Sequence, residues 1–205
     1  RGAAQLLARE LPDEELAEYT RIIIREADRL RDLVDRLLGP NRQPDLKQLN
    51  IHEILEHVRN LIIAEFGPEM TISRDYDPSL PEFSGDRSQL VQVMLNILRN
   101  AVQAAPSPRE CAITLRTRSQ RQFTIGTERH RLVCRVDLLD NGPGIPEEML
   151  HAIFVPMVTT KAEGSGLGLS LAQSMINSHH GLLECESEPG NTRFTIYLPM
   201  DSEDA

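Results

Sequence analysis

Three short motifs, polar or rich in glycine, follow one another in the second half of this chain. Asn96 and Asn100 lie four residues apart within a predicted helix. Asp140 opens the sequence DNGPG directly after a predicted strand, and GSGLGL at 164–169 leads into another predicted helix. Each motif alone has ordinary structural explanations, but the three in this order are hard to obtain by chance. Their order and spacing therefore favour a functional interpretation over a structural one.

The asparagine pair lies on one face of an otherwise apolar helix that we predict to run from the capping residue Asp86 to about Ala105. Residues four apart share a helix face, and buried amides cost free energy unless they are paired. An amide oxygen is also a neutral, hard ligand that suits Mg²⁺, which usually keeps waters and substrate phosphates. Taken alone, such a pair is more often structural than a metal site.

The two glycine motifs point to a ligand with an amine and phosphates. A carboxylate such as that of Asp140 at a strand end can accept a hydrogen bond from an exocyclic amine, although DNG is also common turn chemistry. In GSGLGL, backbone N–H groups lie beside a helix N-terminus, a combination that binds phosphate. Lys161 could add a positive charge there. For the glycines alone, a flexible hinge is an equally good interpretation.

Composition narrows the class of protein. The 205 residues carry a net charge of −9, which argues against non-specific nucleic-acid binding. The three cysteines (Cys111, Cys134 and Cys185) form no CxxC pair, so we expect reduced core thiols rather than a zinc or redox motif. No apolar run approaches the roughly 18 residues of a membrane span, so no membrane association is expected. The chain begins without Met or a signal-peptide pattern, and we interpret it as a fragment.

We predict an α+β chain in four parts. Residues 1–39 form part of a helical hairpin whose heptad seam would dimerise into a four-helix bundle or, alternatively, pack on its own chain. A Gly- and Pro-rich linker at 40–49 precedes a domain at 50–200, and 201–205 is an acidic tail. Within the domain we expect helices on one face of a mixed sheet. The predicted helices are 50–66, 86–105 and 167–178, and the predicted strands are 70–76, 112–118, 132–139, 182–186 and 193–198, with a polar loop between the second and third strands.

Together these motifs resemble the ATP-binding domain of histidine kinases, in the superfamily that includes gyrase, Hsp90 and MutL. Residues 96–100 are similar to the N box, 140–144 to the first glycine box, 153–161 to the F box and 164–169 to the second glycine box. The resemblance implies a two-layer α/β sandwich of the Bergerat (GHKL) type. Further stretches, at 1–7, 34–40, 74–81 and 156–158, resemble the sensor kinases of nitrogen regulation. The resemblance to these sensor kinases also implies a cytoplasmic homodimer joined through the hairpin, with the response regulator NtrC and a PII-type signal protein as partners.

The resemblance also implies a role for individual residues. Asp140 would bind the adenine amine, Asn100 would hold Mg²⁺, and Arg99 and Lys161 would contact phosphates. The γ-phosphoryl of ATP would pass to a histidine and then to NtrC. None of the six histidines here fits the family's H-E-x-x-N-P motif, so no catalytic residue is predicted and self-phosphorylation is not expected. The full set expected at the nucleotide is Asn96, Arg99, Asn100, Asp140, Gly142, Gly144, Ile145, Lys161, Gly164, Ser165, Gly166, Leu167, Gly168 and Thr192.

Two other functions remain open at this stage. The chain could be a non-catalytic module for dimerisation and PII docking, with an incidental nucleotide site. It could also be an ATP-gated ATPase of the gyrase or Hsp90 type. That class needs a glutamate as general base where this chain has Asn96, which cannot accept the proton.

Overall fold

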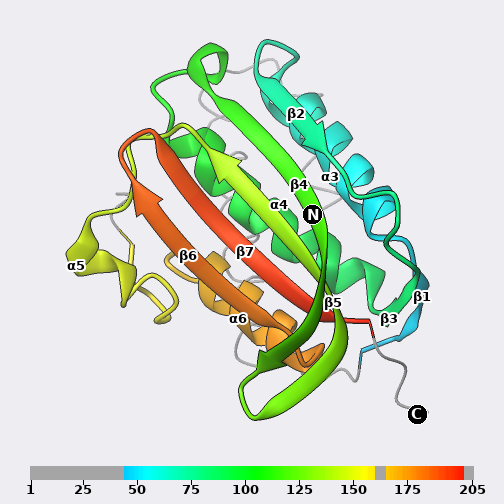
Figure 1. The fold of residues 1–205 in the computed structure, drawn as a ribbon. Helices are drawn as coiled ribbons and strands as arrows, with labels where there is room; N and C mark the ends of the chain where they lie inside the picture. The colour runs from blue at the N-terminus through cyan, green and yellow to red at the C-terminus, as the bar shows by residue number, and fades with distance from the viewer. Residues whose placement is uncertain (1–43, 160–164, 201–205) are drawn as a thin grey trace, which may run out of the picture. The chain divides into compact units, whose positions relative to one another are not determined.

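The computed structural model describes residues 44–159 and 165–200, which belong to one compact unit beginning at Pro44. A five-stranded mixed sheet has the order β2-β4-β5-β7-β6. Only the β2–β4 pair is parallel within it. Three helices cover one face of this sheet (Figure 1), so the predicted two-layer α+β fold is confirmed. The bounds are β1 Lys47–Leu49, α3 Ile51–Phe66, β2 Thr71–Asp75, β3 Phe83–Gly85, α4 Arg87–Ala104, a 3₁₀ helix Pro108–Glu110, β4 Ala112–Ile125, β5 Glu128–Asp140, α5 Glu147–Leu150, α6 Gly168–Ser178, β6 Leu182–Glu188 and β7 Asn191–Pro199.

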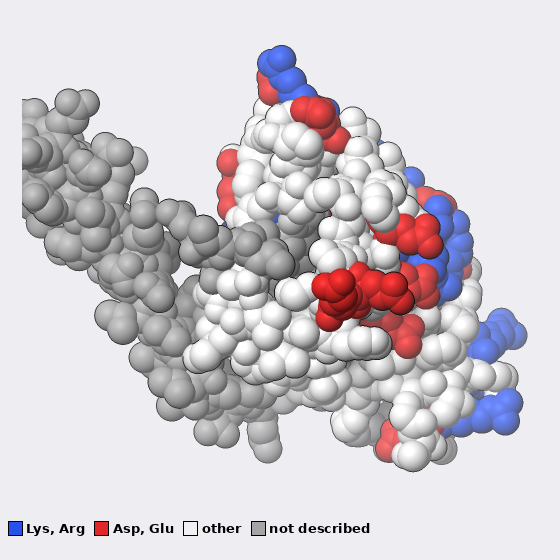
Figure 2. All heavy atoms as spheres, turned by 90° about the vertical axis from the view of Figure 1, so that its left-hand side faces the viewer, with Lys and Arg blue, Asp and Glu red and all other residues white. Residues whose placement is uncertain are grey.

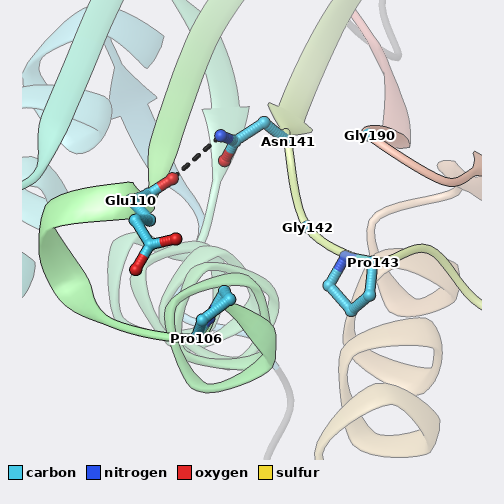
Figure 3. Close-up of a pocket in the computed structure, with 6 residues that line it drawn as sticks. All are labelled: Pro106, Glu110, Asn141, Gly142, Pro143 and Gly190. Atoms are coloured by element: carbon cyan, nitrogen blue, oxygen red, sulfur yellow. Dashed lines mark hydrogen bonds between the residues drawn. The ribbon is translucent and has the colours of Figure 1, made fainter.

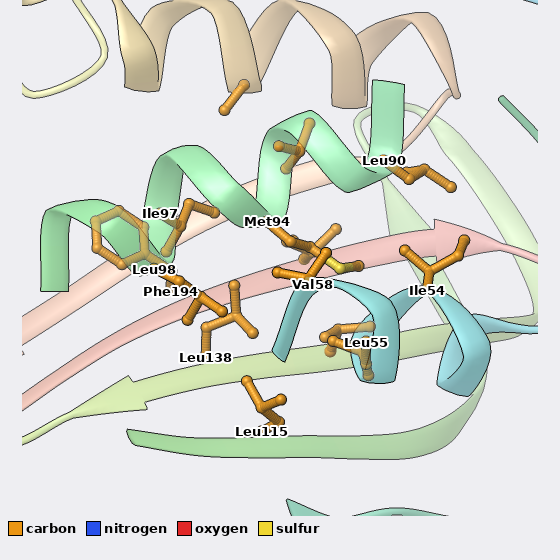
Figure 4. Close-up of a cluster of buried hydrophobic side chains, with 14 of the residues drawn as sticks. Ile54, Leu55, Val58, Leu90, Met94, Ile97, Leu98, Leu115, Leu138 and Phe194 are labelled. Carbon is orange, nitrogen blue, oxygen red and sulfur yellow. The ribbon is translucent and has the colours of Figure 1, made fainter. Parts of the chain in front are cut away.

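An aliphatic core lies between the sheet and helices α3, α4 and α6. Leu90, Met94 and Leu98 of α4 are fully buried, and Figure 4 shows them between the neighbouring helix and the strands. Leu115 and Leu138 reach the same core from the sheet. The apolar spacing that predicted these helices therefore corresponds to the faces that they bury.

Side-chain caps fix where two of the helices begin. The Asn50 side chain accepts a hydrogen bond from His52 N at 2.9 Å at the start of α3. Asp86 accepts from Ser88 N at 2.9 Å and Gln89 N at 3.2 Å at the start of α4. Because a cap satisfies N–H groups that have no partner within the helix, both predicted starts are confirmed.

The predicted loop between β4 and β5 is wrong. Both strands continue through it in one antiparallel register, from Ile113↔Asp140 to Ile125↔Glu128. Only a two-residue turn with φ +60° at Gly126 remains, and the tip extends past the neighbouring strands (Figure 1). Phe123 stacks on Tyr197 at 4.4 Å. Residues 118–125 and 128–132 of this extension are exposed or half-buried, and they lack the alternation of buried apolar residues by which strands are recognised.

Two short strands, β1 and β3, form a small sheet that the sequence pattern did not indicate. β1 falls at the end of the predicted linker and pairs antiparallel with β3, from Lys47↔Gly85 to Leu49↔Phe83. The predicted hairpin at 1–39 and the tail at 201–205 lie outside the described residues. The division of the chain into four parts stays a prediction.

The surface is strongly charged along one edge. The edge strand β6 carries the exposed residues Glu184, Glu186 and Glu188. Figure 2 shows acidic side chains gathered on the side where β6 and α5 lie. Charged side chains on an edge strand oppose pairing with another chain. Among the helices of the described ranges, none combines the length and apolar character needed to cross a membrane.

The cysteines and two of the histidines belong to the packing, as expected. The three cysteines are unpaired, and burial raises the pKa of each thiol, to about 12 for Cys134. His179 is buried and its Nε2 accepts a hydrogen bond from Asp86 N at 2.9 Å. His52 lies 3.0 Å from Thr117 Oγ1 through its Nε2 and stacks on Tyr76 at 4.8 Å.

Candidate functional site

Helix α4 brings the asparagine motif against the second glycine box. The Asn96 amide donates from Nδ2 to Gly168 O at 3.0 Å. Gly168 is the first residue of α6, so this bond joins the middle of one helix to the N-terminus of the other. Asn100 lies one turn further along α4 and is half-buried. Asn96 therefore has the partner that a half-buried amide requires.

Asp140 and Thr192 lie side by side at the ends of two paired strands. They are direct partners in the β5–β7 register, and Thr192 is only 4% exposed. One carboxylate oxygen of Asp140, Oδ1, accepts a hydrogen bond from Gly142 N at 2.8 Å. Burial raises the pKa of this carboxyl, although the hydrogen bond from Gly142 opposes the rise. The strand end thus presents a partly desolvated carboxylate beside a hydroxyl.

The first glycine box is packed tightly against the turn that leads into β7. Gly142 O accepts a hydrogen bond from Gly190 N at 2.8 Å. Gly144 has a φ of +86°, and a Cβ built there would lie 2.9 Å from the carbonyl carbon of Glu188. A side chain would thus have no room at Gly144, so the glycine is required by both its backbone conformation and this close approach.

The second glycine box is described only from Ser165 onward. Gly166 has a φ of +65°, and its carbonyl accepts a hydrogen bond from Met157 N at 2.9 Å. Leu167 is buried and precedes α6 directly. The N-terminal N–H groups of α6 receive no hydrogen bond from a side chain of the capping residue Leu167, and their binding of phosphate stays a prediction. Lys161 and Gly164 lie outside the described residues.

Arg99 points to a different neighbour from the other predicted site residues. Its Nε and Nη2 donate to Glu65 Oε2 of α3 at 3.0 and 2.8 Å. Both side chains are about 40% exposed, with values of 42% and 39%. The structure therefore brings Asn96 to the second glycine box but places Arg99 in an ion pair with α3.

Ser187 was missed by the sequence reasoning. Its Oγ accepts a hydrogen bond from Ile145 N at 2.8 Å and lies 2.7 Å from Thr192 Oγ1. It thereby joins the first glycine box to the predicted site residue on β7. The only sequence signal is a serine close before the turn Pro189-Gly190, and that signal does not reveal which strand faces which.

A hollow of about 540 Å³ lies beside the first glycine box (Figure 3). Asn141 crosses to the 3₁₀ helix there, donating from Nδ2 to Glu110 O at 2.9 Å. Only Gly142 is shared with the predicted site residues, so the hollow adjoins the predicted site rather than coinciding with it. Its lining residues are Pro106, Glu110, Asn141, Gly142, Pro143 and Gly190.

The sequence matches two known protein families. Residues 85–202 match the histidine kinase-, DNA gyrase B- and HSP90-like ATPases. Residues 1–44 match the His Kinase A (phospho-acceptor) domain. The first match covers more than half of the chain and includes all fourteen predicted site residues.

Several sensory histidine kinases/phosphatases named NtrB are similar along almost the whole chain. Those of Vibrio alginolyticus and Escherichia coli O157:H7 are 52% and 50% identical over 98% of this chain, and that of Rhizobium meliloti is 40% identical over 97%. The chain spans 57%, 57% and 53% of the length of these relatives.

Solved structures of histidine kinases share the fold. The catalytic domain of ThkA is 26% identical, with a TM-score of 0.63 over 76% of this chain and 96% of its own. ThkA in complex with the response regulator protein TrrA is 25% identical, with a TM-score of 0.67 over 100% of this chain and 57% of its own. Full-length ShkA in complex with AMPPNP, at 24% identity, has a TM-score of 0.75 over 100% of this chain and 43% of its own, which shows the fold alone.

Proposed function

Because this chain belongs to the family of histidine kinase-, DNA gyrase B- and HSP90-like ATPases and also matches the phospho-acceptor domain of histidine kinases, we propose that it binds Mg²⁺-ATP as the catalytic part of a sensor histidine kinase. The observation that carries the proposal is the meeting of the motifs. Asn96 is bonded to Gly168, and Asp140 lies beside Thr192 and is bonded to Gly142. A carboxylate suited to an amine, at the end of β5, and a helix N-terminus suited to phosphate, at the start of α6, thus belong to the same domain.

Asp140 is the group that we assign to the base. Its Oδ1 is held by Gly142 N, which leaves Oδ2 to accept a hydrogen bond from the adenine amine. A hydrogen bond to a partly desolvated carboxylate is stronger than the same bond in water. Gly144 and Ile145 would line the base next to it, because they continue the same loop.

The phosphate end would be formed by backbone and amide groups. The N–H groups at the start of α6 would bind the phosphates, because the helix dipole there favours negative charge. The half-buried amide of Asn100 carries the kind of oxygen that suits Mg²⁺, which usually keeps waters and substrate phosphates as its other ligands. Asn100 would contribute one amide oxygen. When bound, Mg²⁺ neutralises the charge that develops on the phosphates.

Phosphoryl transfer would then depend mainly on positioning and charge neutralisation. The γ-phosphoryl would pass to a histidine other than the six of this sequence, none of which lies in an H-E-x-x-N-P motif. We further propose the response regulator NtrC as the final acceptor, a PII-type protein as regulator, a homodimer joined through residues 1–39 and a cytoplasmic location. The support for these is the resemblance to NtrB kinases and the ThkA structure with its response regulator.

The gyrase-like alternative has less support. Position 96 carries an amide whose Nδ2 is engaged by Gly168 O. Such a group offers no base to activate a water molecule.

The test is calorimetric titration of a non-hydrolysable ATP analogue, with and without Mg²⁺. We expect Asn100→Ala to lose the Mg²⁺-dependent part of the affinity, because it removes the amide oxygen assigned to the metal. Gln92→Ala is the matched control, since Gln92 lies on the same helix and is exposed. If Asn100→Ala keeps the full Mg²⁺ dependence, the metal assignment is wrong. If the unaltered chain binds nothing in either condition, the non-catalytic docking module becomes the better interpretation.

A further inference from the structure

Ser187 links two parts of the candidate site, Ile145 and Thr192, that lie far apart in the sequence. Ile145 N donates to its Oγ at 2.8 Å, and Thr192 Oγ1 lies 2.7 Å away. Ser187 and Thr192 are direct partners in the β6–β7 register, and Asp140 faces Thr192 from the other side. The side chains of Ser187, Thr192 and Asp140 therefore form one row across three strands, on the face that the helices cover.

The protons of this row can be followed one by one. A serine or threonine hydroxyl has one proton to donate and two lone pairs that accept. Ser187 accepts the Ile145 N–H proton, and in its contact with Thr192 Oγ1 either hydroxyl can be the donor. We assign the donor to Ser187, which leaves its second lone pair unused. The Thr192 hydroxyl proton then remains to be offered to another acceptor. In this head-to-tail order each hydrogen bond polarises and strengthens the next.

This order of protons places a hydrogen-bond acceptor, the Asp140 carboxylate, beside a hydrogen-bond donor, the Thr192 hydroxyl. Asp140 accepts, and Thr192, once it receives the Ser187 proton, donates. Adenine presents the complementary pair on its Watson–Crick edge, an amine donor beside the ring-nitrogen acceptor N1. Guanine presents the reverse order, with an O6 acceptor beside an N1–H donor, and it is mismatched at both positions.

We propose that Ser187 is a positioning residue for base recognition, which fixes the Thr192 hydroxyl as a donor toward N1 of adenine and ties the first glycine box to that strand. The proposal rests on the proposed ATP site and deepens it. Ser187 acts through Thr192 and Ile145 and does not itself contact the nucleotide.

The test compares ATP with 1-deaza-ATP, in which a C–H group replaces the N1 acceptor, by equilibrium binding to the full chain. The unaltered chain should bind ATP about tenfold more tightly, the value of one hydrogen bond. In Ser187→Ala this ratio should fall to about twofold or less. Thr192→Val should lower it equally, and the double variant should lower it no further. Ser187→Thr keeps the hydroxyl and should keep the ratio.

A second readout does not need nucleotide. Because Ile145 N–H loses its acceptor in Ser187→Ala, its amide hydrogen exchange in the nucleotide-free protein should accelerate, while the Ser187→Thr variant should exchange as the unaltered chain does. If Ser187→Ala folds poorly, Ser187→Cys carries the same expectation, since a thiol is only a weak donor and acceptor.

The outcomes separate this inference from the proposed function. A Ser187→Ala variant that weakens ATP and 1-deaza-ATP equally would show a merely structural role and overturn the proposal, while the ATP site would stand. If the unaltered chain binds neither nucleotide, the ATP site and the role of Ser187 are both wrong.

Discussion

Replacing Gly144 by alanine tests how tightly the first glycine box is packed. A Cβ at this position would lie 2.9 Å from the carbonyl carbon of Glu188 and 3.0 Å from both Glu188 O and Pro189 N. Real Cβ atoms essentially never come closer than 3.0 Å to such neighbours. The neighbours are backbone atoms, so they cannot rotate away, and the loop or the turn must move.

The expected cost has two parts, which a matched variant separates. An alanine forced to a left-handed φ costs about 1–2 kcal/mol, and overpacking costs about 1–3 kcal/mol more. Gly190 has nearly the same φ, +84° against +86°, but a Cβ there meets nothing within 4 Å. Gly190→Ala should therefore lose about 1–2 kcal/mol of unfolding free energy, and Gly144→Ala about 2–5 kcal/mol.

Urea unfolding of both variants, followed by circular dichroism, measures the difference directly. The Gly144→Ala variant should also bind an ATP analogue more weakly, because the next residue, Ile145, is the donor to Ser187. Gly190→Ala should bind it nearly as the unaltered chain does. Equal losses of stability in the two variants would refute the reasoning, since they would leave no cost for the close approach to Glu188 and Pro189.

Two further predictions concern stability away from the glycine boxes. Asp86→Ala should lower the unfolding free energy, measured in urea, by about 2–3 kcal/mol, because it removes the helix cap and the acceptor of Asp45 N, which donates to Asp86 Oδ2 at 3.1 Å. Asp45→Ala is the control, since it changes an exposed side chain and keeps the backbone N–H, and it should cost less than about 0.5 kcal/mol. Burial lowers the pKa of His52 below its ordinary 6.5, so the unfolded chain binds the proton more readily. The unfolding free energy should therefore fall as the pH drops below about 6.5, and urea titrations between about pH 5 and 8 should show less of this dependence in His52→Gln.

The elements that the sequence predicted well are those with a strong local signal. Helix 86–105 has a capping aspartate and an apolar stripe, and α4 is observed at Arg87–Ala104 with Asp86 as its cap. The strand predicted at 70–76 is observed at Thr71–Asp75. In both, the residues that decide the structure are neighbours in the sequence.

The elements that were missed depend on distant partners. β1 and β3 are three residues each and are stabilised by pairing with one another across more than thirty residues. The outer half of the β4–β5 hairpin is mostly polar and none of its residues is fully buried, so its strand structure comes chiefly from cross-strand pairing. Neither kind of partner can be read from a window of ten or fifteen residues.

The candidate site contains residues that motifs in the sequence identify and residues that only the strand register brings together. Motifs identified Asp140 and Thr192, but not that they are neighbours with Ser187. Two apolar rows run across the same three strands: Leu138, Phe194 and Cys185, then Val136, Ile196 and Leu183. All are buried except Cys185, which is partly buried against the core.

A slip of one residue would turn an entire row to the other face of the sheet. Burial of the two apolar rows therefore fixes the strand register. The same register aligns Asp140, Thr192 and Ser187 as the next row, at the strand ends. Substitutions that preserve the volume of Phe194 should leave base recognition intact, whereas a polar residue in its place would disturb the site without touching it.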